Sequence, residues 1–371
     1  MMKIGFLSHS DLSIYYFRAP IMRALRDRGH KVFAIVPNGR YINKISSEFQ
    51  TVIYDLDKAS LNPFRVLKDT KDLANILKPL NLDMIQTAAH KSNVFGTFAA
   101  QKAGIRHILN LVEGMGSFYT KSDIKTIVVR NVIEMLYKHA FSISDACIFV
   151  NDADPDYMLK KGIIDSSKVR RIKSVGIDAN EFDPSIVSAQ EFGQKKVVLM
   201  VGRALFDKGI REFYEAADLL SSRDDCKFVF VGDTYEGNAS SASSLFLQNQ
   251  NVTWIKWSDR IREILKGSYI YVLPSYKEGF PRTVLEAMSM EKACVVSGCD
   301  GCLEAVKDGV NGLICKVKDS KDLASKIETL LDNEHLVKKM GKNGRNLVLE
   351  NYDEHIITKQ YLEVYKEFID V

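Results

Sequence analysis

The sequence predicts an α/β protein in which two doubly wound, Rossmann-like domains follow one another along the chain. Two observations support this: strand-like and helix-like segments alternate, and the alternation starts again near the middle of the chain. In the first series, residues 3–7, 31–36 and 84–86 have the apolar runs of buried strands, and residues 20–28 and 67–77 have helical periodicity. Repeated βα units predict a parallel sheet with helices on both faces.

The second series begins at residue 196, after a segment rich in Gly, Asp and Pro that lacks a sustained period. Its helix at 211–220 alternates with strands predicted at 196–201, 227–231, 252–255, 270–273 and 293–297. We therefore predict a first domain at 1–175, a linker at 176–194, a nucleotide-binding domain at 195–350, and a C-terminal helix at 351–371 that packs back towards the first domain. Ligands of such open sheets bind at the carboxyl ends of the strands.

Composition limits the class of protein. The 371 residues are 46% hydrophobic, which is enough for two cores, and no run of about 18 apolar residues is present. With no signal-peptide pattern at residues 1–7, we expect a cytoplasmic protein, peripheral on the cytoplasmic face of the inner membrane. The six cysteines suit reduced core thiols. Cys299 and Cys302 have the spacing of half a zinc or redox site, but no second pair completes it, and no metal is expected.

Charge is unevenly distributed. Residues 1–175 hold 26 Lys and Arg against 16 Asp and Glu, so this half should meet an anionic partner. The sequence lacks the motifs of nucleic-acid-binding folds, and we expect no nucleic acid. An anionic membrane surface fits better, because basic side chains near it each contribute about 1 kcal/mol.

The most informative segment runs from Leu273 to Met288, where a predicted strand turns into a helix. Glu278 on the turn and Glu286 in the helix direct two carboxylates to one crevice. Gly279 permits close approach of a ligand, and Pro281 suits a helix start. The first amides of the helix, at Arg282, Thr283 and Val284, form an anion site. A phosphorylated, polyhydroxylated ligand suits this arrangement. The alternative is an ordinary helix start with two unrelated glutamates.

A second cationic loop, residues 202–209, follows the first strand of the second series. Arg203 offers a planar fork and Lys208 a point charge, which together suit a diphosphate. The loop lacks both the Gly-Lys-Ser/Thr of a P-loop and the Gly-x-Gly-x-x-Gly of a dinucleotide site. The alternative is that both side chains are solvated loop charges.

These motifs resemble those of the retaining family-four glycosyltransferases, which have the GT-B fold of two Rossmann-like domains facing across a cleft. The resemblance spans the second domain and is carried by Gly202-Arg203, Lys208-Gly209, Pro274-Ser275, Glu278-Gly-Phe-Pro281, Glu286-Ala287, residues 298–304 and residues 308–312.

The resemblance implies a role for each of these side chains. Arg203 and Lys208 would hold the diphosphate of a nucleotide sugar, and Glu286 the ribose hydroxyls. Glu278, with the backbone of Gly279, Phe280 and Pro281, would contact the transferred sugar. The family needs no metal or other cofactor, because cationic side chains and helix dipoles neutralise the leaving diphosphate.

Segments of the first domain resemble a narrower group within this family, which adds N-acetylgalactosamine from UDP-N-acetylgalactosamine to undecaprenyl-diphosphate-linked N,N'-diacetylbacillosamine in bacterial protein N-glycosylation. These segments are residues 6–10, 13–20, 59–64, 88–93 and 111–119. The implied partners are a UDP-sugar and a polyprenyl-diphosphate-linked sugar acceptor.

Two features depart from the broad family. Many members carry a Gly-Gly pair after the first strand, whereas residues 8–14 contain no glycine. Many have a histidine where this chain has Glu113, before Gly114. Glu113 would place a carboxylate beside the reacting sugar, where it could bind the acceptor hydroxyl or stabilise an oxocarbenium charge, so we count it with Glu278, Arg203 and Lys208 as a catalytic candidate. The alternative is a buried structural role.

Other first-domain residues are candidates for contact with the acceptor or a membrane. They are Ser13, Ile14, Arg18, His90, Lys91, Phe118, Tyr119, Lys121, Lys125 and Arg130. A lone histidine such as His90 is more often structural. The helix predicted at 124–138 carries an apolar stripe bordered by basic residues, which suits either a core-facing helix or an interfacial one.

We therefore expect a retaining transferase of N-acetylgalactosamine. Two alternatives are a UDP-sugar epimerase of the same fold, which would turn over the donor without a lipid acceptor, and a catalytically inactive, membrane-bound sensor of sugar nucleotides. The sensor would bind UDP tightly but release no UDP in the presence of acceptor. A further alternative is a family-four transferase acting on another lipid-linked glycan.

Overall fold

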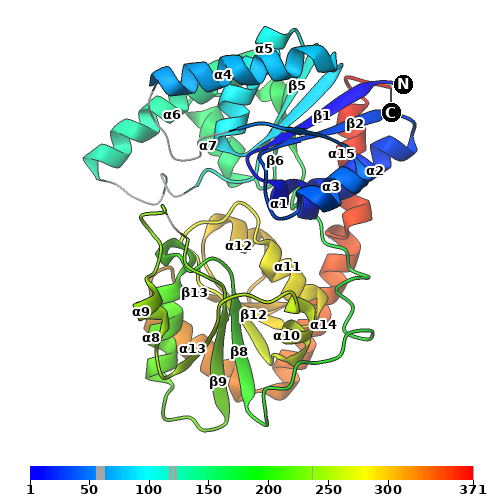
Figure 1. Ribbon diagram of the computed structural model, residues 1–371. Coiled ribbons are helices and arrows are strands. Elements are labelled where there is room, and N and C mark those ends of the chain that lie inside the picture. The colour runs from blue at the N-terminus through cyan, green and yellow to red at the C-terminus, as the bar shows by residue number, and fades with distance from the viewer. Residues whose placement is uncertain (56–62, 117–118, 120–122, 236, 371) are drawn as a thin grey trace. The chain divides into compact units, whose positions relative to one another are not determined.

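The computed structural model describes residues 1–55, 63–116, 119, 123–235 and 237–370 (Figure 1). The chain forms two compact units. Unit 1 comprises Met1–Gly176 together with Glu354–Val371, and unit 2 comprises Ile177–Asp353. The segment that follows residue 176, which we expected to be a linker, is therefore part of unit 2.

Unit 1 is built on a seven-stranded parallel sheet with the order β3-β2-β1-β4-β5-β6-β7. The order turns back between β1 and β4, as in doubly wound folds. The strands are β1 (Lys3–Ser8), β2 (Lys31–Val36), β3 (Gln50–Ile53), β4 (Met84–Ala88), β5 (His107–Val112), β6 (Ala146–Phe149) and β7 (Val169–Arg171).

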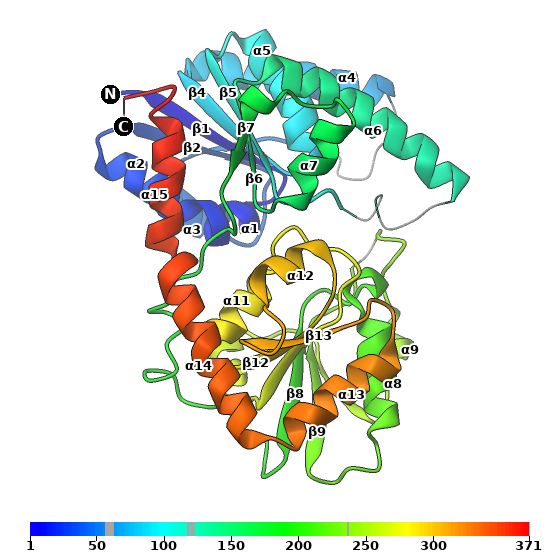
Figure 2. The same ribbon diagram turned by 180° about the vertical axis from the view of Figure 1, so that it is seen from behind.

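Helices cover both faces of this sheet. They are α1 (Asp11–Ser13), α2 (Ala19–Asp27), α3 (Ile42–Glu48), α4 (Pro63–Leu77), α5 (Thr97–Ala103), α6 (Ile124–Ile143), α7 (Ala153–Lys160) and α15 (Glu354–Tyr365). Alternation along the strands sorts the side chains between the faces. Leu7 and Ile85 belong to the core formed with α4 and α5, whereas their neighbours Phe6 and Gln86 contact Tyr365 of α15. Figure 2 shows α15 against this sheet, beside α2.

Short helical turns follow two strands at the carboxyl edge of this sheet. The stretch after β1 forms α1 and the π-helical turn η1 (Ile14–Arg18), and a second π-helical turn, η3 (Ser92–Gly96), follows β4. π-Helical turns redirect side chains and are frequent at functional sites. Here η1 directs Arg18 into the interior of unit 1.

Unit 2 is built on a six-stranded parallel sheet with the order β10-β9-β8-β11-β12-β13. Its strands are β8 (Lys196–Val201), β9 (Cys226–Val231), β10 (Val252–Ile255), β11 (Ile270–Leu273), β12 (Ala293–Ser297) and β13 (Gly312–Cys315). Its helices are α8 (Ile210–Leu219), α9 (Ser244–Leu247), α10 (Ile261–Gly267), α11 (Arg282–Ser289), α12 (Asp300–Ala305), α13 (Ser320–Leu331) and α14 (Glu334–Asn351). The two sheets of parallel strands confirm the predicted fold class.

Glycines let the strand ends of unit 2 approach one another. Gly209 has φ +75°, and a Cβ there would lie 2.1 Å from the carbonyl oxygen of Pro274. Gly232 has φ +154°, and a Cβ there would lie 1.7 Å from the carbonyl oxygen of Gly202. Only glycine fits such contacts, so the loops after β8, β9 and β11 are packed backbone to backbone.

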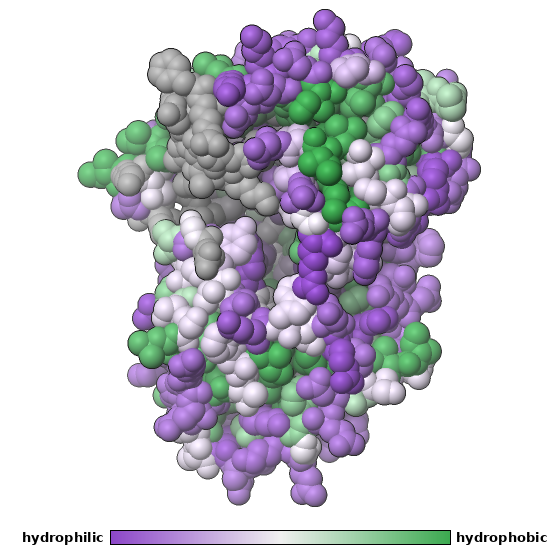
Figure 3. Space-filling view, in the orientation of Figure 1, coloured by the Kyte–Doolittle hydropathy of each residue, from purple (hydrophilic) through white to green (hydrophobic). Residues whose placement is uncertain are grey.

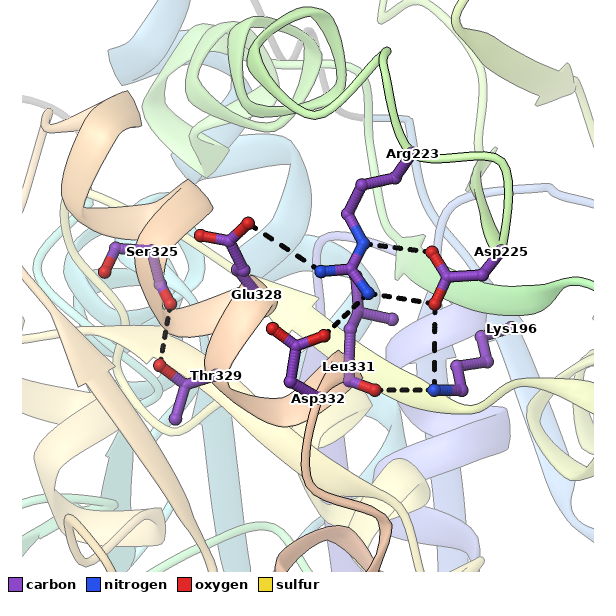
Figure 4. A network of polar contacts seen from close by, with 8 residues as sticks. All are labelled: Lys196, Arg223, Asp225, Ser325, Glu328, Thr329, Leu331 and Asp332. Atoms are coloured by element: carbon purple, nitrogen blue, oxygen red, sulfur yellow. Dashed lines mark hydrogen bonds and ion pairs between the residues drawn. The ribbon is translucent and has the colours of Figure 1, made fainter.

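At the other end of β8 and β9, an ion-pair network supports unit 2 (Figure 4). The Arg223 guanidinium lies 2.9 Å from Asp225, 2.7 Å from Asp332 and 3.7 Å from Glu328, and Lys196 lies 3.8 Å from Asp225. The hydrogen bond from Arg223 is the main reason that the pKa values of Asp225 and Asp332 lie below their ordinary range. This network contains none of the predicted site residues, and we assign it to stability.

Candidate active site

The carboxyl edge of unit 2 brings together the first pair of predicted site residues. Lys208 follows β8 and Glu278 follows β11, and these strands are neighbours in the sheet. The Lys208 Nζ donates to both carboxylate oxygens of Glu278, at 2.6 and 2.8 Å. Ser275 Oγ also donates to Glu278 Oε1, at 2.6 Å, and its side chain is fully buried. Ser275 entered the sequence analysis only as part of the motif that carries the family resemblance, with no role at the site.

The turn that carries Glu278 contacts the end of β12 and the start of α12. Ser297, at the end of β12, donates a hydrogen bond to the Ser275 carbonyl. The start of α12 lies directly against the turn, since a Cβ on Gly301 would meet the carbonyl oxygens of Gly279 at 2.4 Å and Glu278 at 2.7 Å. These contacts fix the backbone of the turn, so that the position of the carboxylate is determined before a ligand arrives.

The second glutamate, Glu286, lies on α11 and accepts a hydrogen bond from Arg282 Nε at 3.0 Å. Burial raises the pKa of its carboxyl, and Arg282 acts against this shift. The helix α11 begins after Pro281 without a side-chain cap. Of the three amides predicted for an anion site, that of Val284 donates to the Pro281 carbonyl at 3.1 Å and is therefore already engaged within the turn.

Arg203 and Phe280, which are also predicted to bind the donor substrate, have different surroundings. Arg203 is exposed, with its guanidinium 5.2 Å from the centre of the Tyr235 ring. Among the described residues, no carboxylate is paired with Arg203. The Phe280 side chain is buried and packs against Tyr352, with ring centres 5.2 Å apart, so Phe280 can offer a ligand only its backbone. That is the role implied for it.

At the carboxyl edge of unit 1, Glu113 follows β5 and is paired with Arg18. The Arg18 guanidinium donates to Glu113 Oε1 at 3.0 Å and to the Tyr361 hydroxyl at 3.1 Å. The Arg18 side chain is 1% exposed and that of Glu113 is 23% exposed. Burial opposes the charge of Arg18, but Tyr361 and Glu113 outweigh this and raise the pKa of the guanidinium. Arg18 therefore holds Glu113 in place, whereas the carboxylate can reach solvent.

His90 follows β4, the strand next to β5. Its Nδ1 lies 2.5 Å from the Tyr137 hydroxyl, and a Cβ on Gly116 would lie 2.8 Å from its Nε2. Burial, with a smaller effect from His9, lowers the pKa of the imidazole to about 4. His90 is thus neutral at pH 7 and supports the loop that contains Gly114 and Gly116.

The other first-domain candidates divide into three sets. Ser13 and Ile14 are buried, so their side chains present no surface to an acceptor or a membrane. Tyr119 and Arg130 contact each other, with the guanidinium 5.3 Å from the ring centre, and Lys91 is partly buried beside His90. Phe118, Lys121 and the side chain of Lys125 lie outside the described residues, as does most of the 59–64 segment.

No three His, Cys, Asp or Glu side chains gather to hold a metal ion in the part of the chain that the structure describes. Cys299 and Cys302 are buried free thiols. The described helices include none that is long and apolar enough to cross a bilayer.

The carboxyl edge of unit 2 thus holds two carboxylates, two cations and a helix start, which are the groups expected to bind a phosphorylated sugar. Comparison with known proteins identifies the class. The family model described as glycosyl transferases group 1 matches residues 182–347. The chain is also 45% identical, over 99% of both chains, to N,N'-diacetylbacillosaminyl-diphospho-undecaprenol alpha-1,3-N-acetylgalactosaminyltransferase of Campylobacter jejuni. The protein therefore belongs to the group 1 glycosyltransferases.

More distant proteins agree with this placement. UDP-Gal:alpha-D-GlcNAc-diphosphoundecaprenol alpha-1,3-galactosyltransferase of Escherichia coli is 26% identical over 98% of each chain. Among solved structures, sucrose-phosphate synthase of Thermosynechococcus elongatus superposes with a TM-score of 0.81 at 17% identity, over 99% of each chain. At that identity the superposition supports the GT-B fold alone.

Proposed function

We propose that this protein transfers N-acetylgalactosamine from UDP-N-acetylgalactosamine to undecaprenyl-diphosphate-linked N,N'-diacetylbacillosamine and forms an α-1,3 linkage with retention. The observation that carries the proposal is the 45% identity over essentially the full length of the Campylobacter jejuni enzyme, whose name states this acceptor, sugar and linkage. Such near-complete coverage includes the acceptor half, in which relatives of this family differ.

On the donor side, each cation and carboxylate has a distinct task. Arg203, exposed and without a carboxylate partner among the described residues, supplies a planar fork for the diphosphate. Lys208 and the start of α11 at Arg282 add positive charge where the leaving UDP becomes more negative. Glu286 takes the ribose hydroxyls, and Glu278 takes the hydroxyls of the transferred sugar.

On the acceptor side, Glu113 is the residue that we place near the reacting hydroxyl. Its carboxylate is oriented by Arg18 and still reaches solvent, which suits a group that orients an alcohol or stabilises an oxocarbenium charge. The acceptor hydroxyl attacks the sugar on the face that UDP leaves, and an oxygen of the leaving phosphate takes its proton. Arg203 and Lys208 stabilise that phosphate. The reaction uses no metal ion in this proposal, so treatment with EDTA leaves the rate unchanged.

The first experiment follows UDP release by the purified protein from UDP-N-acetylgalactosamine, with and without the lipid-linked acceptor, and determines the mass of the lipid product. We expect acceptor-dependent UDP release and the addition of one N-acetylhexosamine. UDP binding without transfer would refute this acceptor. Turnover of the donor to an isomer without acceptor would instead indicate an epimerase.

We further propose that unit 1 binds the cytoplasmic surface of the inner membrane through α6. Most of the apolar stripe predicted on this helix is solvent-exposed, with Ile124 83% and Val128 57% exposed, and Met135 continues it, whereas Leu136 packs against the core of unit 1. The start of α6 projects from the other helices of unit 1 in Figures 1 and 2, and Figure 3 shows hydrophobic atoms gathered there. An exposed apolar stripe on a basic domain is typical of interfacial helices.

Binding to vesicles tests this attachment. We expect Val128→Glu to weaken binding of the protein to vesicles of anionic phospholipid by about tenfold, since a charge replaces an inserted apolar side chain. Leu349→Glu is the matched control, because Leu349 is an exposed leucine on α14 of unit 2. Equal binding of both variants would contradict a role for α6.

A further inference from the structure

We propose that Glu278 acts as a built-in counter-anion for Lys208, that the donor diphosphate replaces it, and that this exchange makes the site prefer an intact UDP-sugar to bare UDP. The inference rests on the proposed function of the donor edge. It assigns to the Lys208–Glu278 pair a role in discriminating substrate from product.

The pair is already formed without a ligand. Both carboxylate oxygens of Glu278 accept from Lys208 Nζ, and Ser275 supplies a third hydrogen bond. Glu278 is only 9% exposed and Lys208 23% exposed. An ion pair in such surroundings is weakly screened by water, so the positive charge of Lys208 is largely compensated before any phosphate arrives.

This pairing distinguishes Lys208 from the other phosphate cation. Arg203 is exposed and has no carboxylate partner among the described residues, so it can take a phosphate without breaking an ion pair. Lys208 can take a phosphate only by sharing its ammonium group with Glu278 or by giving up that contact. The diphosphate therefore meets one open cation and one that is already occupied.

The exchange affects UDP and UDP-sugar differently. When bare UDP takes Lys208, the Glu278 carboxylate loses its cationic partner, keeps the hydrogen bond from Ser275 and lies near the negative diphosphate. A buried charge without a counter-charge is strongly unfavourable. An intact UDP-sugar carries sugar hydroxyl groups that can donate hydrogen bonds to the Glu278 carboxylate. These bonds replace the hydrogen bonds that Glu278 loses when Lys208 turns to the diphosphate. The penalty thus falls on the product and favours its release after transfer.

The test compares UDP and UDP-N-acetylgalactosamine binding to the wild type and to Glu278→Gln by calorimetry. Gln keeps the shape and can still accept from Ser275 and Lys208, but it removes the negative charge. We expect the Kd for UDP to fall about tenfold in Glu278→Gln, while UDP-N-acetylgalactosamine gains no affinity, so that the preference for the sugar nucleotide is lost. Glu334→Gln, in the exposed Lys338–Glu334 pair of α14, is the matched control and should change neither Kd.

The outcomes separate the two proposals. If the wild type binds neither nucleotide, the proposed function of the donor edge fails. If the wild type binds UDP but Glu278→Gln binds it no more tightly, the counter-anion inference is overturned while the donor assignment stands. Glu278→Ala, which also removes the charge, should show the same gain for UDP and serves if the thermal unfolding of Glu278→Gln shows that it does not fold.

Discussion

Removing the Glu113 side chain separates the structural and the chemical roles of this carboxylate. In Glu113→Ala, the guanidinium of Arg18 loses its only carboxylate partner among the described residues while it stays 1% exposed. Breaking a buried ion pair from one side costs 3 to 5 kcal/mol. Glu113 itself is 23% exposed, and the Tyr361 hydroxyl still accepts from Arg18. We therefore expect a loss at the lower end, about 3 kcal/mol of unfolding free energy.

Glu113→Gln provides the comparison, because the amide oxygen of Gln can still accept from Arg18. The unfolding free energy of Glu113→Gln should fall by only about 1 kcal/mol. This is about the difference between a hydrogen bond to a carboxylate and one to a neutral amide oxygen. If the carboxylate also acts in the reaction, Glu113→Gln should nevertheless lower kcat by about 100-fold, within the range of acid–base and electrostatic contributions.

Urea-induced unfolding followed by circular dichroism measures the stability of both variants, and UDP release with acceptor measures kcat. Equal stability losses for Ala and Gln would refute the argument from the buried guanidinium. Wild-type kcat in a folded Glu113→Gln would assign Glu113 a purely structural role. The double variant Glu113→Ala with Arg18→Met should recover part of the lost stability, since no uncompensated charge remains.

Three further predictions concern other parts of the molecule. Arg203→Ala and Lys208→Ala should each cost on the order of 3 kcal/mol of transition-state stabilisation, which UDP release measures as a lower kcat/KM. An unchanged kcat/KM in either variant would exclude that residue from the diphosphate site. Because burial lowers the pKa of His90 from 6.5 to about 4, the folded state resists its protonation. The unfolding free energy should therefore fall between these pH values as the pH is lowered, and the fall should be smaller in His90→Gln. Arg223→Gln should lower the thermal unfolding temperature at pH 7 but not below the lowered pKa of Asp225, where the paired carboxylates are protonated, and an effect independent of pH and salt would contradict an ionic origin.

The donor edge was largely predictable because its signals are local in sequence. Glu278, Glu286 and the start of α11 lie within one strand-turn-helix unit, and the neighbouring position of Lys208 follows from the doubly wound strand order. The direct pairing of Lys208 with Glu278 was not predicted, because strand order places the two loops side by side without fixing which charges touch. Whether these residues bind a donor remains a prediction.

The acceptor edge was harder, since its contacts join distant parts of the chain. Arg18 meets Glu113 across 95 residues and Tyr361 across 343. The sequence predicts a C-terminal helix that packs back towards the first domain, but it does not say which of its residues meets Arg18. Ser13 and Ile14 were named as candidates for contact with the acceptor or a membrane, whereas the helical turns after β1 bury them. On α6 the apolar stripe was visible in the sequence, and only the structure distinguishes an exposed stripe from a core-facing one.

The position of α15 in unit 1 has a consequence for the order of folding during synthesis. Unit 1 comprises Met1–Gly176 and Glu354–Val371, and α15 places Tyr361 and Tyr365 in its core. These residues leave the ribosome only after all of unit 2 has been made. At a few to twenty residues per second, the first 176 residues wait at least about 10 s for the helix that completes their core. Unit 2, which is continuous in sequence, can therefore fold before unit 1 gains its last helix.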